Sequence, residues 1–304
     1  MKTTKNTSKS DPKPDLVAQE IRPGQSIELL KELHILTREG KLNQDSRRKL
    51  KQVYHLYGFI EKLLLELPAG RDDENKGLNN GISLADHGAG KSYLGFIIYD
   101  LFFNAANTSS LGHPVGHIFG IETRSELVQK SRELAARLGF KGMSFLNLSV
   151  AESAQSADLP QQIDIVTALH ACDTATDDAI AFGLQKRAKY MVLVPCCQAE
   201  VAAHLRNNRG LAVAKTPLAE LWRHPLHTRE LGSQITNVLR CLYLEASGYQ
   251  VTVTELVGWE HSMKNELILA KYTGAKKASA ANHLREVLTQ FGLEELLQTR
   301  FKLV

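Results

Sequence analysis

The chain has 304 residues, of which 43% are hydrophobic and 23% are charged. This composition is that of an ordinary globular protein, and it excludes a disordered or fibrous chain. The net charge is +4, and residues 1–70 alone hold 13 Lys and Arg against 9 Asp and Glu. The excess positive charge therefore lies in the N-terminal part, where it suits an anionic partner such as RNA and, equally, a surface kept soluble by its charge.

Residues 1–25 have the Lys-, Ser- and Pro-rich composition of a flexible tail, without the apolar stretch of a secretory signal. The most apolar segment, 94–106, is too short to span a bilayer and contains Asp100. The four cysteines fit no zinc-ribbon spacing. We therefore expect a soluble cytoplasmic protein with no membrane segment and no metal site.

Residues 26–80 predict a helical cap followed by a polar linker. One helix is expected from an N-cap at Ser26 to Gly40, and a second from about Asp45 to Pro68. The second helix has apolar residues at spacings of three and four, which predict one buried stripe: Leu50, Val53, Tyr57, Ile60, Leu64 and Leu67. Its opposite face carries Arg48, Lys51, His55, Gly58 and Lys62. Such a face can follow a phosphate backbone, although it is more often simply solvated, and Arg48, Lys51 and His55 are the candidate substrate contacts.

Short apolar runs then alternate with helical segments across residues 81–275. The runs lie at 82–86, 117–122, 143–148, 163–169 and 189–195. Strands that alternate with helices predict a parallel sheet covered on both faces. Two last runs, 249–257 and 266–272, are joined by a short polar link and predict an antiparallel hairpin at one edge, before a C-terminal helix in 276–304.

The stretch SLADHGAGKSYLG, 83–95, resembles two different ligand-binding turns. Gly90-Lys91-Ser92 matches the end of a phosphate-binding P-loop, but the glycine required five positions earlier is replaced by Ala85, inside the first strand. Asp86-x-Gly88-x-Gly90 instead matches the turn of a nucleoside-binding strand–turn–helix unit. The sequence therefore favours the second interpretation.

The second strand should end in an acid that binds the two ribose hydroxyls, and Glu122 occupies that position. A nicotinamide dehydrogenase would show the same features. The antiparallel edge hairpin favours a class I methyltransferase, by fold analogy. The residues expected to bind S-adenosylmethionine are Asp86, Gly88, Ala89, Gly90, Glu122, Thr123 and Leu169.

Two further motifs follow the fourth and fifth strands, LHACDTATDDA (169–179) and VPCCQ (194–198). With the turn at Asp86, they resemble one branch of the S-adenosylmethionine-dependent methyltransferases. That branch holds bacterial proteins of unassigned substrate, eukaryotic methyltransferase-like proteins and, distantly, the tRNA acceptor-stem 2′-O-methyltransferases. The resemblance covers about residues 45–272. It implies a Rossmann-like α/β fold with a seven-stranded, mostly parallel sheet. Gln198 and Asp173 stand where the tRNA enzymes carry His and Gly, so a 2′-hydroxyl acceptor is not implied.

Methyl transfer from a sulfonium is an in-line displacement, so the protein positions the acceptor and handles its proton. His170 and Asp173, after the fourth strand, are the candidates for this task, although Asp173 can equally cap a helix. Cys197, or its neighbour Cys196, offers a thiolate that could add to a cytosine ring. Vicinal cysteines rarely share one tetrahedral metal ion, so no metal is expected.

The sequence therefore predicts an S-adenosylmethionine-dependent methyltransferase that acts on RNA (tRNA or rRNA) at an oxygen or nitrogen atom. Two alternatives stay open. One is a methyltransferase of a protein or small molecule, and the other is a catalytically silent RNA-binding module that keeps the donor fold.

Overall fold

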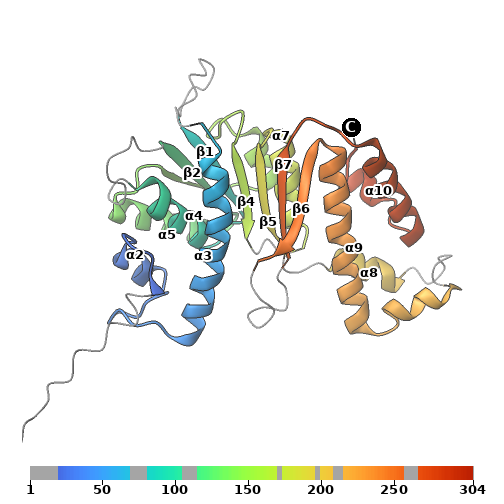
Figure 1. The fold of residues 1–304 in the computed structure, drawn as a ribbon, viewed down its shortest axis with the longest axis horizontal. Coiled ribbons are helices and arrows are strands. Elements are labelled where there is room, and N and C mark those ends of the chain that lie inside the picture. The colour runs from blue at the N-terminus through green and yellow to red at the C-terminus, as the bar shows by residue number, and fades with distance from the viewer. Residues whose placement is uncertain are drawn as a thin grey trace, which may run out of the picture.

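The computed structural model describes residues 20–68, 81–104, 115–169, 173–195, 199–207, 215–256 and 266–303. A seven-stranded sheet with helices on both faces forms the centre of the molecule (Figure 1). The strand order is β3-β2-β1-β4-β5-β7-β6. The strands are β1 (Ile82–His87), β2 (Gly116–Ile121), β3 (Met143–Leu146), β4 (Ile165–Leu169), β5 (Tyr190–Val194), β6 (Tyr249–Glu255) and β7 (Glu266–Tyr272).

The first five strands pair in parallel, and β7 lies antiparallel between β5 and β6. All six residues of β1 and all five of β5 are buried, as expected for strands covered on both faces. The edge strand β6 is largely exposed or half-buried. The predicted Rossmann-like α/β fold, with a mostly parallel sheet and an antiparallel edge hairpin, is confirmed.

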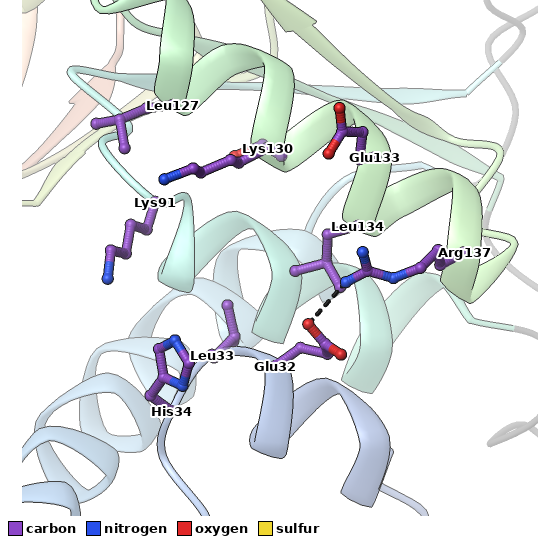
Figure 2. Close-up of a pocket in the computed structure, with 10 residues that line it drawn as sticks. Glu32, Leu33, His34, Lys91, Leu127, Lys130, Glu133, Leu134 and Arg137 are labelled. Carbon is purple, nitrogen blue, oxygen red and sulfur yellow. Dashed lines mark hydrogen bonds and ion pairs between the residues drawn. The ribbon is translucent and has the colours of Figure 1, made fainter.

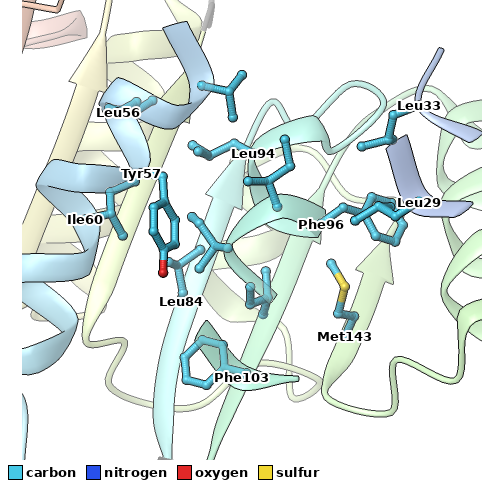
Figure 3. Close-up of a cluster of buried hydrophobic side chains, with 14 of the residues drawn as sticks. Leu29, Leu33, Leu56, Tyr57, Ile60, Leu84, Leu94, Phe96, Phe103 and Met143 are labelled. Carbon is cyan, nitrogen blue, oxygen red and sulfur yellow. The ribbon is translucent and has the colours of Figure 1, made fainter. Parts of the chain in front are cut away.

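Two hydrophobic clusters fill the two faces of the sheet. Alternation along β1 sends Leu84 into the first cluster and Ala85 into the second. The first cluster includes side chains from the N-terminal helices, among them Leu29, Leu56, Tyr57 and Ile60, packed against the sheet (Figure 3). Residues 26–68 thus bury their apolar side chains in the same core as the strands.

The helices connect the strands and cover both faces. They are α2 (Ile27–Glu32), α3 (Gln44–Leu65), α4 (Tyr93–Ile98) continued by a π-helical turn (Tyr99–Phe103), α5 (Ser125–Leu138), α6 (Val150–Gln155), α7 (Ala175–Gln185), α8 (Glu200–Asn207), a 3₁₀ turn (Pro217–Trp222), α9 (Pro225–Ala246), α10 (Ala278–Phe291) and α11 (Leu296–Thr299). No helix among the described residues is long and apolar enough to cross a membrane.

The predicted helix from Ser26 to Gly40 is wrong at its C-terminal end. Ser26 does cap α2, because its hydroxyl accepts a hydrogen bond from the Leu29 N–H at 3.1 Å. The helix ends at Glu32, however, and His34 adopts a left-handed φ of 55°. After this turn, Ile35 and Leu36 are buried as well.

The prediction for α3 is confirmed. It begins after the N-cap Asn43, and every member of the predicted apolar stripe is at most 8% exposed. Arg48, Lys51 and His55 are exposed. At its C-terminal end, Glu66 accepts hydrogen bonds from the Tyr190 hydroxyl at 2.7 Å and from Lys271 Nζ at 2.9 Å, which attaches the helix to β5 and β7.

Neither α6 nor α8 is predicted from the sequence. The short helix α6 begins with a capping box, in which Ser149 and Glu152 bond reciprocally. The helix α8 begins at Glu200, after β5 ends at Val194, and α9 extends from Pro225 to Ala246. Both α8 and α9 prove important for the site below.

Candidate functional site

The turn after β1 has the backbone conformation that its glycines predict. Gly88 and Gly90 have φ angles of 66° and 58°, and Ser92 follows at 52°. Residues with a side chain rarely adopt this left-handed region, so the conformation favours glycine at positions 88 and 90. The Gly90 N–H donates a hydrogen bond to Glu122 Oε2 at 2.8 Å, and the Ala89 N–H donates to the Ile121 carbonyl at 3.0 Å. We call residues 86–92 the donor turn.

Asp86 lies beneath the donor turn rather than on its surface. Its side chain is 2% exposed, and its Oδ1 accepts a hydrogen bond from the Thr167 hydroxyl at 2.9 Å. Burial raises the pKa of Asp86 to about 6, although the hydrogen bond from Thr167 acts in the opposite direction. The carboxyl group therefore joins the end of β1 to β4 and supports the turn from below.

Glu122 lies at the end of β2, as predicted, and is 7% exposed. Burial would raise the pKa of its carboxyl group, but hydrogen bonds from the Arg124 side chain, the Arg124 N–H and the Gly90 N–H lower this pKa to about 2. Arg124 Nε and Nη2 each lie 3.0 Å from a carboxylate oxygen, and Thr123 Oγ1 donates at 3.3 Å. Glu122 is thus a fully charged acceptor whose present partner is a largely exposed arginine.

Two residues of the donor half were missed by the sequence reasoning. Asn147 follows β3, and its Nδ2 donates to the carbonyls of Glu122 and Thr123 at 3.0 and 2.8 Å. Its position near the end of the third predicted strand was the sequence feature that could have identified it as a candidate site residue. His87 is only 4% exposed, and neither ring nitrogen has a hydrogen-bond partner in the described part of the chain.

The His87 ring lies 5.4 Å from that of Phe182 on α7. Burial lowers the pKa of His87 to about 4, so the imidazole is neutral at physiological pH. A buried polar ring without a partner costs free energy. Burial therefore disfavours the charged form of both neighbours, Asp86 and His87.

Asp173 lies on the acceptor side, directly after residues 170–172. It has a φ of 51°, and its Oδ1 accepts hydrogen bonds from the N–H groups of Ala199 and Glu200 at 3.0 and 3.3 Å. The carboxylate therefore caps the start of α8, which follows β5, rather than the start of its own helix α7. It joins the segment after β4 to the segment after β5. The other catalytic candidates, His170 and Cys197, lie outside the described residues, as do Cys172 and Cys196.

A buried ion pair lies directly behind Asp173. Arg240 of α9 is fully buried and donates from Nε and Nη2 to the two carboxylate oxygens of Asp177, each at 2.7 Å. Its Nη2 also donates to the Asp173 carbonyl at 2.8 Å, and its Nη1 to Asn237 Oδ1 at 3.1 Å. Asn237 Nδ2 in turn donates to Glu266 Oε2 at the start of β7, at 2.7 Å. We call this network the acceptor clamp.

The remaining predicted site residues belong neither to the donor turn nor to the acceptor clamp. Leu169 is half-buried at the end of β4. Arg48, Lys51 and His55 share the exposed face of α3, where Arg48 lies 3.9 Å from Asp45 and His55 packs edge-on against Phe59. In the described part of the chain, no cluster of three or more His, Cys, Asp or Glu side chains could hold a metal ion.

Comparison with known proteins identifies the family. A family model described as a methyltransferase domain matches residues 48–204, which include the donor turn, Glu122 and Asp173. The chain belongs to this methyltransferase family. Together with the sheet topology, the match makes the protein an S-adenosylmethionine-dependent methyltransferase. The narrower resemblance to the branch with the HACD and PCC motifs stays a prediction. No curated protein matches the sequence.

Several solved methyltransferase structures are similar. Magnesium protoporphyrin IX methyltransferase from Synechocystis PCC 6803, with bound S-adenosylhomocysteine, is 11% identical, with 81% of this chain and 93% of that chain covered and a TM-score of 0.45. A SAM-dependent methyltransferase from Aquifex aeolicus is 16% identical, with 77% and 100% covered and a TM-score of 0.39. TrmK of M. capricolum, with S-adenosylhomocysteine, is 10% identical, with 66% of each chain covered and a TM-score of 0.38.

The donor half of this methyltransferase fits its cofactor. Two left-handed glycines open the turn to a ligand, and a carboxylate with a pKa of about 2 stands beside them to accept hydrogen bonds from hydroxyl groups. S-Adenosylmethionine supplies an electrophilic methyl group on a positively charged sulfur atom.

Proposed function

We propose that this methyltransferase modifies RNA, tRNA or rRNA, at an oxygen or nitrogen atom, in the cytoplasm. The observation that supports an RNA substrate is the concentration of positive charge in residues 1–70 together with the exposure of Arg48, Lys51 and His55 on one face of α3. Such a face can follow a phosphate backbone. These three residues are the proposed substrate contacts, and residues 26–68 are the proposed substrate-facing cap.

In this proposal, Gly88, Ala89 and Gly90 form the backbone cradle of the donor, and Glu122 accepts hydrogen bonds from the ribose hydroxyls. Thr123 and Leu169 flank the same ligand. Asp86 acts indirectly, because its carboxyl group is buried against Thr167 and supports the turn. Arg124 must release at least part of its contact with Glu122 when the ribose binds, since both occupy the same carboxylate oxygens.

On the acceptor side, Asp173 acts as a positioning residue. Its carboxylate accepts from two backbone N–H groups of α8, and the acceptor clamp holds its carbonyl. The proposed proton acceptor is His170. If the methyl acceptor is instead a cytosine ring, Cys197 is the proposed nucleophile, whose thiolate adds to the ring before the methyl transfer. As the acceptor atom forms its bond to the methyl carbon, the carbon–sulfur bond breaks and its electron pair stays on sulfur. The acceptor's proton passes to the base.

The test is transfer of tritiated methyl groups from S-adenosylmethionine into total cellular RNA by the full chain. Label that disappears after ribonuclease treatment supports an RNA substrate. Label that survives ribonuclease but not protease, or that is found in small molecules, contradicts it. Nucleoside mass spectrometry of RNA from cells with and without the gene then identifies the modified atom. The Gly88→Val variant, in which donor binding should be weakened, serves as the control.

A further inference from the structure

A pocket of ≈ 320 Å³ lies between the turn after α2, the donor turn and α5 (Figure 2). We call it the α2–α5 pocket. His34 contributes from the left-handed turn after α2, Lys91 from the donor turn, and Lys130 from α5. Lys91 belongs to the Gly-Lys-Ser sequence that resembles a P-loop, and neither the donor turn nor Glu122 uses its side chain.

The charges of this pocket are unevenly distributed along it. At one end, Glu32 is neutralised by Arg137, whose Nη2 lies 2.7 Å from Glu32 Oε2. Lys91, Lys130 and His34 lie toward the other end, as Figure 2 shows. Neither Lys91 nor Lys130 forms an ion pair within the described part of the chain, and both are exposed. Glu133 also lines the pocket, where it accepts a hydrogen bond from Gln129 Nε2 at 2.8 Å. The lining therefore carries charges of both signs, and Lys91 is its basic side chain on the donor turn.

Apolar side chains line the wall between the two ends. Leu33 and Leu134 are buried, and Leu127 is half-buried. A second depression shares Glu32 and His34 with the pocket and adds Lys31, Arg38 and Glu28, so basic side chains, with one further acid, continue away from the donor turn. Positive groups spaced along an extended surface, with apolar patches between them, match a chain of phosphates separated by sugars and bases. An isolated small anion would need only one end of this surface.

We infer that the α2–α5 pocket binds a backbone phosphate of the RNA substrate, with Lys91, Lys130 and His34 as its contacts. The inference rests on the proposed RNA methyltransferase function and names a second contact surface for the same substrate. Because Lys91 directly follows Gly90, a phosphate bound here lies beside the donor turn. The contact would fix the path of the RNA strand relative to the methyl donor.

The experiment measures binding of a fluorescein-labelled single-stranded RNA oligonucleotide to the full chain by anisotropy, over a series of salt concentrations. The test variant is Lys91→Gln combined with Lys130→Gln. The matched control is Lys276→Gln combined with Lys302→Gln, which removes the same charge from exposed positions elsewhere. The test variant should lose about tenfold in RNA affinity at low salt, and the slope of log K against log salt should fall by about 1, as expected for one lost phosphate contact. The control should match the wild type.

Other results would overturn the inference in distinguishable ways. If the wild type binds RNA and the test variant binds it equally well, the pocket assignment is wrong while the proposed function stands. If the wild type has no affinity for RNA, the proposed function itself fails and the inference with it. Calorimetry with S-adenosylmethionine provides a further check, because a test variant that loses donor affinity would place Lys91 in the donor site. Full displacement of the RNA by inorganic phosphate at constant ionic strength would assign the pocket to a free anion.

Discussion

The two halves of the site are built in different ways. The donor half, at the ends of β1 and β2, depends on backbone conformation: two left-handed glycines and one carboxylate that binds the Gly90 N–H. The acceptor half, after β4 and β5, depends on side chains that are distant in sequence, since Arg240 of α9 holds Asp177 and the Asp173 carbonyl. The donor turn can be predicted from a few consecutive residues, whereas the acceptor clamp becomes visible only once the chain is folded.

The largest expected effect comes from breaking the acceptor clamp. Arg240→Met should lower the free energy of unfolding by about 3–5 kcal/mol, because it leaves the Asp177 carboxylate buried without its partner. Urea unfolding measures this change. The matched control is Arg223→Met, which removes an ion pair with Glu220 whose partners are 66% and 67% exposed, and should cost about 0–1 kcal/mol. A loss at Arg240 no larger than at Arg223 would show that the clamp contributes little.

A conservative change at the same position sharpens the comparison. Arg240→Lys keeps the charge but loses the bidentate geometry, so the acceptor half should be misaligned while the donor half is unaffected. We expect a lower kcat for methyl transfer and an unchanged affinity for S-adenosylmethionine by calorimetry. Equal losses in both measurements would mean that the two halves do not act separately.

Binding of S-adenosylmethionine by the donor half should be sensitive to changes in the backbone conformation of its turn. Gly88→Val places a β-branched residue at a φ of 66°, which costs about 1–3 kcal/mol and should weaken S-adenosylmethionine binding about 10- to 100-fold. Calorimetry measures the affinity. Gly58→Val on α3 is the matched control, because a Cβ at Gly58 would meet no atom within 4 Å. Normal donor binding by Gly88→Val would refute the role of the turn.

His87 gives the donor half a pH dependence. The pKa of this buried imidazole is lowered to about 4 in the folded protein, so the unfolded chain binds a proton more readily below pH 6.5. Its contribution to stability is present above pH 6.5 and is lost as the pH falls toward 4, by about 2 kcal/mol at pH 5. Asp86, with its pKa raised to about 6, changes stability in the opposite direction over the same range, so the comparison is between wild type and His87→Leu at each pH. Relative to the wild type, His87→Leu should gain about 2 kcal/mol in the free energy of unfolding between pH 7 and pH 5, measured by urea unfolding. An unchanged profile would contradict the burial of a neutral ring.

The smallest expected effect concerns Arg124. Its side chain is 60% exposed and forms an ion pair with the Glu122 carboxylate, the group proposed to accept hydrogen bonds from the ribose. An exposed ion pair contributes about 0–1 kcal/mol, so Arg124→Ala should strengthen S-adenosylmethionine binding by no more than about fivefold. Glu122→Ala should weaken it in the same calorimetric assay. Weaker binding by Arg124→Ala would mean that the guanidinium contacts the donor instead of competing with it.

Much of the donor half could be predicted from the sequence. Asp86, Gly88, Gly90 and Glu122 stand at the ends of apolar runs, and the structure places all four at the ends of β1 and β2. The inward position of Asp86 could not be predicted, because its partner Thr167 is 81 residues away. Nor could the role of Asp173 be predicted, since it caps α8 rather than the adjacent helix α7.

Local patterns along the chain were enough to predict the strands, the parallel sheet with its antiparallel edge, the buried stripe of α3 and the glycine turn. Each of these follows from residues close together in the chain, through hydrophobic periodicity or an allowed φ angle. The acceptor clamp, the lack of a hydrogen-bond partner for His87 among the described residues, and the lysines of the α2–α5 pocket became apparent only in the folded structure. These features depend on contacts between side chains that are distant in the sequence and come together when the helices pack on the sheet. Local sequence patterns do not predict such contacts.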